Sequence, residues 1–268
     1  MSISKRLDEA RRAFGAGDLS ASAAAHTSGR ITSAAEEKHG GAGSQYIGDL
    51  VYGGLDGIIT TFAVVSGVAG AQLGTPIILI LGLANLFADG FSMATGAYLS
   101  SKSEREYYDR EWQREAWEVD HFPEGERTEL IEVYREQGYS DEEANTLVEI
   151  QSRNPQRWVN AMMINELGLL KDDRKPLLSG LMTLVAFVIA GSVPMLIYLL
   201  GLLIPISAET AFPIAIALSA IALFGLGAAK VVITQLNPVR SGLEMLIVGG
   251  LAAVVAYVVG ALLKGIGG

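Results

Sequence analysis

Carboxylate, amide and thioether side chains occur at helical spacing within stretches that are otherwise apolar. Asp49 and Asp56 are seven residues apart. Asn85, Asp89 and Met93 follow one another at intervals of four. Each set therefore lies on one face of a helix. Carboxylate and amide oxygens bind many divalent cations, and a methionine sulfur favours softer ions than Mg²⁺ or Ca²⁺. The two faces together predict a path for a first-row ion such as Fe²⁺, Mn²⁺, Co²⁺ or Zn²⁺.

Taken singly, these residues have simpler interpretations. A lone methionine such as Met93 is more often core filler than a ligand. An aspartate near a helix end often caps the helix or bridges to a neighbour, and Asp49 fits that interpretation. Asp56 and Asp89 lie deeper in apolar sequence, where a charged carboxylate is costly and is by default a functional group.

A second set of candidate ligands occupies a strongly charged stretch. Its glutamates recur at intervals of 7, 4 and 3 residues, which places them on one stripe of a helix. These residues are Glu104, Glu111, Glu115 and Glu118. Interleaved arginines fit a solvated, salt-bridged face equally well. The segment AMMINE favours a metal site, because it supplies Met162, Met163 and Glu166.

Several other kinds of chemistry are excluded by what the sequence lacks. Without cysteine the chain forms no disulfide, thiolate metal site or iron–sulfur cluster. It contains no nucleophile–base arrangement, glycine-rich phosphate loop or histidine-based metal motif. The sequence therefore predicts neither an enzyme nor an ATP-driven pump, and it predicts no prosthetic group.

The elements that must position these side chains are membrane helices. Half of the 268 residues are apolar, and only 18% are charged. A helix needs about 20 apolar residues to cross a bilayer. Five stretches meet this length, at residues 46–70, 75–100, 176–207, 210–229 and 245–263. The expected fold is an all-α membrane protein with five transmembrane helices, in which Pro194 and Pro213 kink or start helices.

A polar segment, residues 101–175, is inserted between the second and third spans. It carries 19 acidic and 11 basic side chains, which accounts for nearly all of the net charge of −9. It begins as a continuation of the second span. Three further helices are expected, one closed by Gly138, one capped by Ser140 with Glu143 in capping-box position, and one starting on Pro155. This acidic bundle attracts cations and repels nucleic acid.

The remaining segments are residues 1–45, expected to be a mobile tail, and the paired spans 46–100 and 176–268. Lysine and arginine flank the spans on one side only, at Lys102, Arg105, Arg174, Lys175, Lys230 and Arg240. The positive-inside rule then predicts that the N-terminus and the acidic segment are cytoplasmic.

The segments YGGLDGIITTFAVVSGVAGA, ADGFSMATGAYLSSKSE and NPQRWVNAMMINELGL occur in this order, with the acidic insert between the second and third. Together they resemble the vacuolar iron transporter family over roughly residues 46–265. The resemblance implies a homodimeric five-helix transporter that exports Fe²⁺ from the cytosol in exchange for protons. Its membrane would be the plasma membrane in a prokaryote or a vacuolar-type membrane in a eukaryote.

Carried over by position, the family's pore aspartate falls on Asp56 and its pore methionine on Met93. The resemblance also implies a set of metal ligands in the insert, namely Glu104, Glu115, Glu118, Glu166, Met162 and Met163.

The sequence departs from the family pattern at two positions. Asn85 stands where some plant members have a pore glutamate, and Asp89, one turn later, is the candidate substitute. Tyr107 stands where a second glutamate of the insert is expected. Neighbouring Glu106 or Glu111 would replace it.

Three functions are compatible with these features. The first is a proton-coupled transporter for Fe²⁺, with Mn²⁺ as a further substrate. The second is a membrane-anchored iron-binding or storage protein, against which the intramembrane Asp56 and Asp89 argue. The third is an uncoupled cation channel. Family members without the acidic insert are associated with manganese, so its presence favours iron by analogy.

Overall fold

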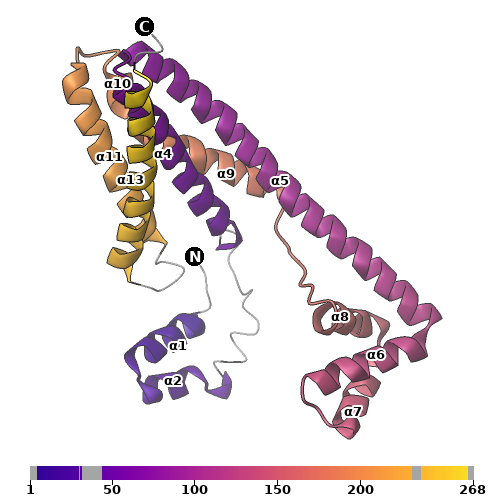
Figure 1. The fold of residues 1–268 in the computed structure, drawn as a ribbon. Helices are drawn as coiled ribbons and strands as arrows, with labels where there is room; N and C mark the ends of the chain where they lie inside the picture. The colour runs from indigo at the N-terminus through magenta and orange to yellow at the C-terminus, as the bar shows by residue number, and fades with distance from the viewer. Residues whose placement is uncertain (1–4, 30, 32–43, 231–236, 265–268) are drawn as a thin grey trace. The chain divides into compact units, whose positions relative to one another are not determined.

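The structure is helical throughout the residues that it describes. The computed structural model describes residues 5–29, 31, 44–230 and 237–264, and no strand forms among them (Figure 1). Five helices in this part of the chain are long and apolar enough to cross a membrane, which confirms the predicted all-α membrane fold. The chain divides into two compact units. We call residues 1–97 with 177–268 the membrane unit, and residues 98–176 the bundle.

Helix α5, Thr75–His121, is a single helix of 47 residues that contributes to both units. Its first part is apolar and its second part is charged, as the sequence analysis predicted for one continuous helix. After Gly96 the sequence contains no glycine or proline up to the end of the helix. Glutamate, arginine and lysine dominate this part and are good helix formers, so nothing in it interrupts the backbone hydrogen bonds.

The membrane unit packs helices at backbone distance. Helix α4, Ile47–Gly70, lies against α9, Pro176–Gly191, and against α13, Pro238–Leu262. A Cβ atom added to Gly57 would lie 2.5 Å from the carbonyl oxygen of Phe187. One added to Gly260 would lie 2.0 Å from the carbonyl oxygen of Gly67. Small residues allow this approach where no hydrophobic effect drives helices together.

Two of the predicted spans differ from the structure in their bounds. The predicted span 176–207 is interrupted after α9 by a 3-10 turn, η2, at Val193–Met195, followed by the short helix α10, Leu196–Leu200. Pro194 lacks the N–H needed to continue α9, so it breaks the helix as expected. Helix α13 begins seven residues before the predicted 245, because the side chain of Asn237 caps it and Arg240 pairs with Glu244 at 3.3 Å.

Helix α11, Ala208–Ala229, completes the spans of the described part of the chain. It begins before Pro213, which therefore lies inside the helix and does not start it.

The bundle consists of the second part of α5 with α6, Pro123–Glu136, α7, Asp141–Ser152, and α8, Pro155–Asn165. Three local predictions are confirmed. Ser140 and Glu143 form a capping box, α8 starts on Pro155, and Gly138 adopts a φ of 97° just after α6. The bundle encloses its own apolar core, whose fully buried members include Leu130, Val148, Met162 and Met163.

Helical structure forms among the described residues of the N-terminal segment, where the sequence analysis expected a mobile tail. It includes α1, Lys5–Ala16, and α2, Leu19–Ala25. The Asp18 side chain caps α2 by accepting hydrogen bonds from the backbone N–H groups of Ser20 and Ala21. The mobility of this segment stays a prediction, and residues 1–4, 30 and 32–43 of it lie outside the described residues.

Candidate metal site

Three glutamates from two consecutive helices of the bundle converge. Glu115 and Glu118 lie one turn apart on α5, and Glu126 lies in the first turn of α6. The chain reverses direction between them at Phe122 and Pro123, where proline starts the new helix. One carboxylate oxygen from each glutamate lies within 4.8 Å of the other two. We call these three residues the glutamate cluster.

Two members of the glutamate cluster are enclosed by protein. The Glu115 side chain is 1% exposed and that of Glu126 is 5% exposed. The Oε2 atom of each is buried and receives no hydrogen bond from an N–H or hydroxyl group, so the two carboxyl groups have only each other as partners when one is protonated. A buried polar atom without a partner is costly, and a cation is the partner that a carboxylate oxygen lacks here.

Burial makes both of these carboxyl groups hold protons tightly. It raises the pKa of Glu115 to about 7, against the opposing effect of the charge of Arg114. It also raises the pKa of Glu126 to about 8, and repulsion by Glu115 adds to the effect. Buried carboxylates that repel one another favour the neutral form. A divalent cation would reverse this preference, because it stabilises the charged form of each ligand.

Arg114 is the cation that contacts Glu115 and Glu118 of the glutamate cluster. Its Nη2 donates to Oε1 of Glu115 at 2.5 Å, and its Nη1 donates to Oε2 of Glu118 at 2.5 Å. Its Nε donates to Oε2 of Glu111 at 2.9 Å. One guanidinium therefore links three glutamates of α5, and it leaves the inner oxygens of Glu115 and Glu126 without a donor.

Of the predicted ligands at the end of α8, Glu166 interacts with the glutamate cluster. Glu166 caps the C-terminal end of α8, and its charge acts on both Glu115 and Glu126. Burial raises the pKa of Glu166, as does repulsion from Glu129. Met162 and Met163 are fully buried in the apolar core, where they pack with residues such as Leu130. Their burial fits core packing, and their role as metal ligands stays a prediction.

The remaining members of the predicted glutamate stripe differ in position. Glu111 reaches the glutamate cluster only through Arg114. Glu104 lies eleven residues before Glu115, or about 16 Å along the helix axis at a rise of about 1.5 Å per residue. Its carboxylate contacts Ser100 and Arg174 instead.

Glu126 is the cluster residue that the sequence analysis missed. Its spacing held a signal, because Glu126, Leu130 and Tyr134 recur every four residues and all three are buried. An acidic residue on the apolar face of an amphipathic helix is unusual and calls for a partner.

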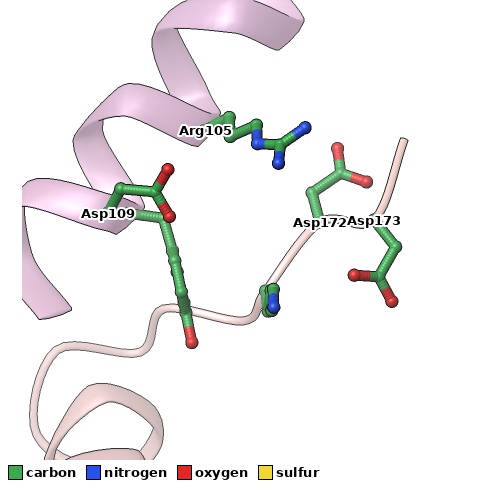
Figure 2. A pocket seen from close by; sticks show the side chains of 6 residues that line it. Arg105, Asp109, Asp172 and Asp173 are labelled. Atoms are coloured by element: carbon green, nitrogen blue, oxygen red, sulfur yellow. The ribbon is translucent and has the colours of Figure 1, made fainter. Parts of the chain in front are cut away.

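The bundle also contains a polar hollow, which lies between α5 and the segment after α8. It has a volume of about 100 Å³ and is lined by Arg105, Tyr108, Asp109, Lys171, Asp172 and Asp173. Figure 2 shows Arg105 reaching from the helix toward Asp172. Asp172 also accepts hydrogen bonds from Arg174. Charges of both signs line this hollow, so it is a poorer cation site than the glutamate cluster.

The intramembrane candidates gather within the membrane unit. The Asp56 carboxylate on α4 is close enough to Asp89 on α5 for the two charges to repel. Asn85, one turn before Asp89, has a buried amide nitrogen without a hydrogen-bond partner, and Met93, one turn after it, is half-buried. Asp49 differs from these residues, because its Oδ2 accepts a hydrogen bond from Ser179 on α9 at 2.6 Å. That contact bridges two helices, as the simpler interpretation of Asp49 expected.

Five membrane helices and an acidic bundle with buried, unpartnered carboxylate oxygens define an integral membrane protein with a candidate cation site. A family model described as the VIT family matches residues 47–261. The chain therefore belongs to the VIT family, as its resemblance in sequence indicated.

Relatives of known name match along most of the chain. A vacuolar iron transporter of Toxoplasma gondii is 38% identical over 267 residues, which cover 96% of this chain and 88% of its own. Vacuolar iron transporter 1 of Arabidopsis thaliana is 36% identical, with 82% and 87% covered. A vacuolar iron transporter of Plasmodium falciparum is 32% identical, with 98% of each chain covered.

Proposed function

We propose that this protein transports Fe²⁺, with Mn²⁺ as a further substrate, and exports the metal from the cytosol in exchange for protons. The observation that carries the proposal is the glutamate cluster, in which two carboxylate oxygens are buried without a partner. The names of the relatives support iron as the cargo. The carboxylates of the membrane unit support passage across the bilayer.

The bundle captures the metal in this proposal. Glu115, Glu118 and Glu126 supply oxygen ligands, and Glu166 adds negative charge nearby. Because protons and metal compete for the same oxygens, capture weakens as the pH falls. The bundle and the N-terminus face the cytosol, as the flanking cations imply, and the protein works as a homodimer, as the resemblance implies.

The membrane unit passes the metal on. Asp56 and Asp89 repel each other when both are charged, and a divalent cation between them removes that repulsion. Asn85 and Met93 lie on the same face of α5 as Asp89 and offer an amide oxygen and a sulfur. Metal entering this group displaces protons from the carboxylates, which couples the two fluxes.

Transport is tested with the full chain in proteoliposomes that contain a pH-sensitive dye. Fe²⁺ uptake with opposite proton movement is expected for the wild type, and Asp56→Ala is expected to abolish both. Asp49→Asn is the matched control, since an amide oxygen can still accept the hydrogen bond from Ser179. Normal flux in Asp56→Ala contradicts the mechanism. Uptake without proton movement indicates a channel, and binding without uptake indicates storage.

Capture is tested separately by fluorescence. The three tryptophans of the chain are Trp112, Trp117 and Trp158, so intrinsic emission reports on the bundle alone. Glu126→Gln is expected to lower the Fe²⁺ affinity measured by quenching about tenfold or more. Glu132→Gln, which removes an exposed carboxylate of the same helix, is the control. Equal affinity in the two variants would exclude Glu126 as a ligand.

A further inference from the structure

The glutamate cluster contains an outer and an inner set of oxygens. The outer set, Oε1 of Glu115 and Oε2 of Glu118, accepts hydrogen bonds from Arg114. The inner set, the Oε2 atoms of Glu115 and Glu126, is buried and receives no hydrogen bond from an N–H or hydroxyl group, and the two carboxyl groups face each other. Both inner atoms belong to side chains that are at least nine-tenths buried. These inner oxygens point to a cation that the cluster is built to hold.

Arg114 is placed to leave the cluster without disturbing the core. Its side chain is 42% exposed, whereas that of Glu115 is 1% exposed. It therefore contacts the cluster from the solvent side, and its own helix provides all three of its glutamate partners. Rotation about side-chain bonds would release the guanidinium into water while α5 and α6 keep their places.

A divalent ion and the guanidinium compete for the same small space. An ion held by one oxygen from each glutamate would lie within a few ångströms of Arg114, since those oxygens lie within 4.8 Å of one another. Two positive charges at that distance repel strongly in a partly buried site. The ion carries twice the charge of the guanidinium and would also reach Glu126, which Arg114 does not contact, so it gains more from the cluster.

We propose that Arg114 is a resident counter-cation of the metal site, which holds the glutamates together in the absence of metal and is displaced by the entering divalent ion. A competitor tethered to the same helix is always present at the site. The apparent affinity is then the intrinsic affinity multiplied by the fraction of molecules in which Arg114 has left the site. Capture is then reversible, as a transporter that must hand its ion onward requires.

The inference depends on metal capture by the bundle, proposed above, and not on transport. It predicts that Arg114→Gln binds Fe²⁺ about tenfold more tightly than the wild type, because a charge-assisted hydrogen-bonded group no longer has to be displaced. If Arg114 served only to support the ligands, the same substitution would weaken binding. The sign of the change therefore separates the two roles.

The test uses the full chain in detergent, titrated anaerobically with Fe²⁺ and followed by tryptophan quenching. Arg135→Gln is the matched control, because Arg135 also pairs with two carboxylates of the bundle, Glu132 and Asp141, away from the glutamate cluster. The control is expected to keep wild-type affinity. In a Glu126→Gln background, the gain from Arg114→Gln is expected to shrink, since the two residues act on one site.

Arg114→Lys provides a second variant if Arg114→Gln fails to fold. An ammonium group keeps the charge but lacks the planar fork that reaches three carboxylates, so an intermediate gain in affinity is expected. Unchanged or weaker binding in a folded Arg114 variant would overturn the inference and leave capture intact. Absence of Fe²⁺ quenching in the wild type would overturn both.

Discussion

The bundle and the membrane unit balance their carboxylates in opposite ways. In the bundle, Arg114 donates to Glu115 and Glu118, so part of the negative charge is neutralised without metal. In the membrane unit, Asp56 and Asp89 lie near each other, and neither α4 nor residues 75–101 contain a lysine or arginine. Carboxylates that have a counter-cation can stay charged in the absence of metal. Carboxylates without one must bind metal or protons.

After the loss expected for Asp56→Ala, the largest effect is expected from removing the second intramembrane carboxylate. Asp89→Asn should lower coupled Fe²⁺ and proton flux in proteoliposomes at least about tenfold, as loss of a charged ligand typically does. Introducing Asn85→Glu into that variant should restore part of the flux, because the new carboxylate lies one turn away on the same face. Full activity of Asp89→Asn alone would show that Asp89 does not replace the missing glutamate.

Packing should differ between the two regions as sharply as charge does. Gly57→Ala would place its Cβ 2.5 Å from the carbonyl oxygen of Phe187, so the helices must separate. The expected cost is about 1–3 kcal/mol, measured as lower thermal stability of the detergent-solubilised protein together with reduced transport. Gly125→Ala in the bundle meets nothing within 4 Å and serves as the control. Equal stability of the two variants would contradict the close approach of α4 and α9.

The pH dependence of the metal-free bundle should reveal its enclosed carboxyl groups. In the folded state the pKa of Glu126 is about 8, above its ordinary value of 4.5. Folding therefore binds a proton, and this contribution is complete below about pH 4.5 and is lost as the pH rises through about 8. Urea unfolding followed by tryptophan emission should show falling stability over this range, with a smaller slope in Glu126→Gln. A wild-type slope in that variant would contradict the burial of a titrating Glu126.

The smallest effect is expected from a change remote from both carboxylate groups. Ser140→Ala removes the capping box of α7 and should destabilise the bundle by about 1 kcal/mol, as loss of an N-cap typically does. Urea unfolding by tryptophan emission measures the loss, and Fe²⁺ quenching should keep its wild-type midpoint. A large change in Fe²⁺ affinity would mean that the bundle transmits local instability to the glutamate cluster.

Features that depend on neighbouring residues were predictable from the sequence. The capping box at Ser140, the left-handed Gly138 and the proline start of α8 each arise within one turn of chain. The pairing of Glu115 with Glu118 followed from spacing on one helix. The break at Pro194 in the third span was also predictable, because proline lacks the N–H that continues a helix, whereas uncharged sequence alone did not show that the helical part ends at Leu200 and not at 207.

Features that depend on how helices meet were not predictable in the same way. Glu126 joins the glutamate cluster only because the chain turns at Phe122. Residue spacing along one helix does not show which residues of the next helix face it. The salt-bridged face that the interleaved arginines predicted is present at Arg114, but spacing could not show that its partners Glu115 and Glu118 also meet Glu126. Glu104 fitted the stripe by angle, but the rise of the helix separates it from Glu115.

The amide at position 85 sets the charge balance of the proposed exchange. An amide carries no proton to give up at any pH, so the proposed exchange has Asp56 and Asp89 as its two carboxyl groups at this depth of α4 and α5. Two protons leaving as one Fe²⁺ enters move no net charge across the bilayer. Under this mechanism a pH gradient drives uptake into sealed vesicles, and an imposed membrane voltage alone leaves it unchanged.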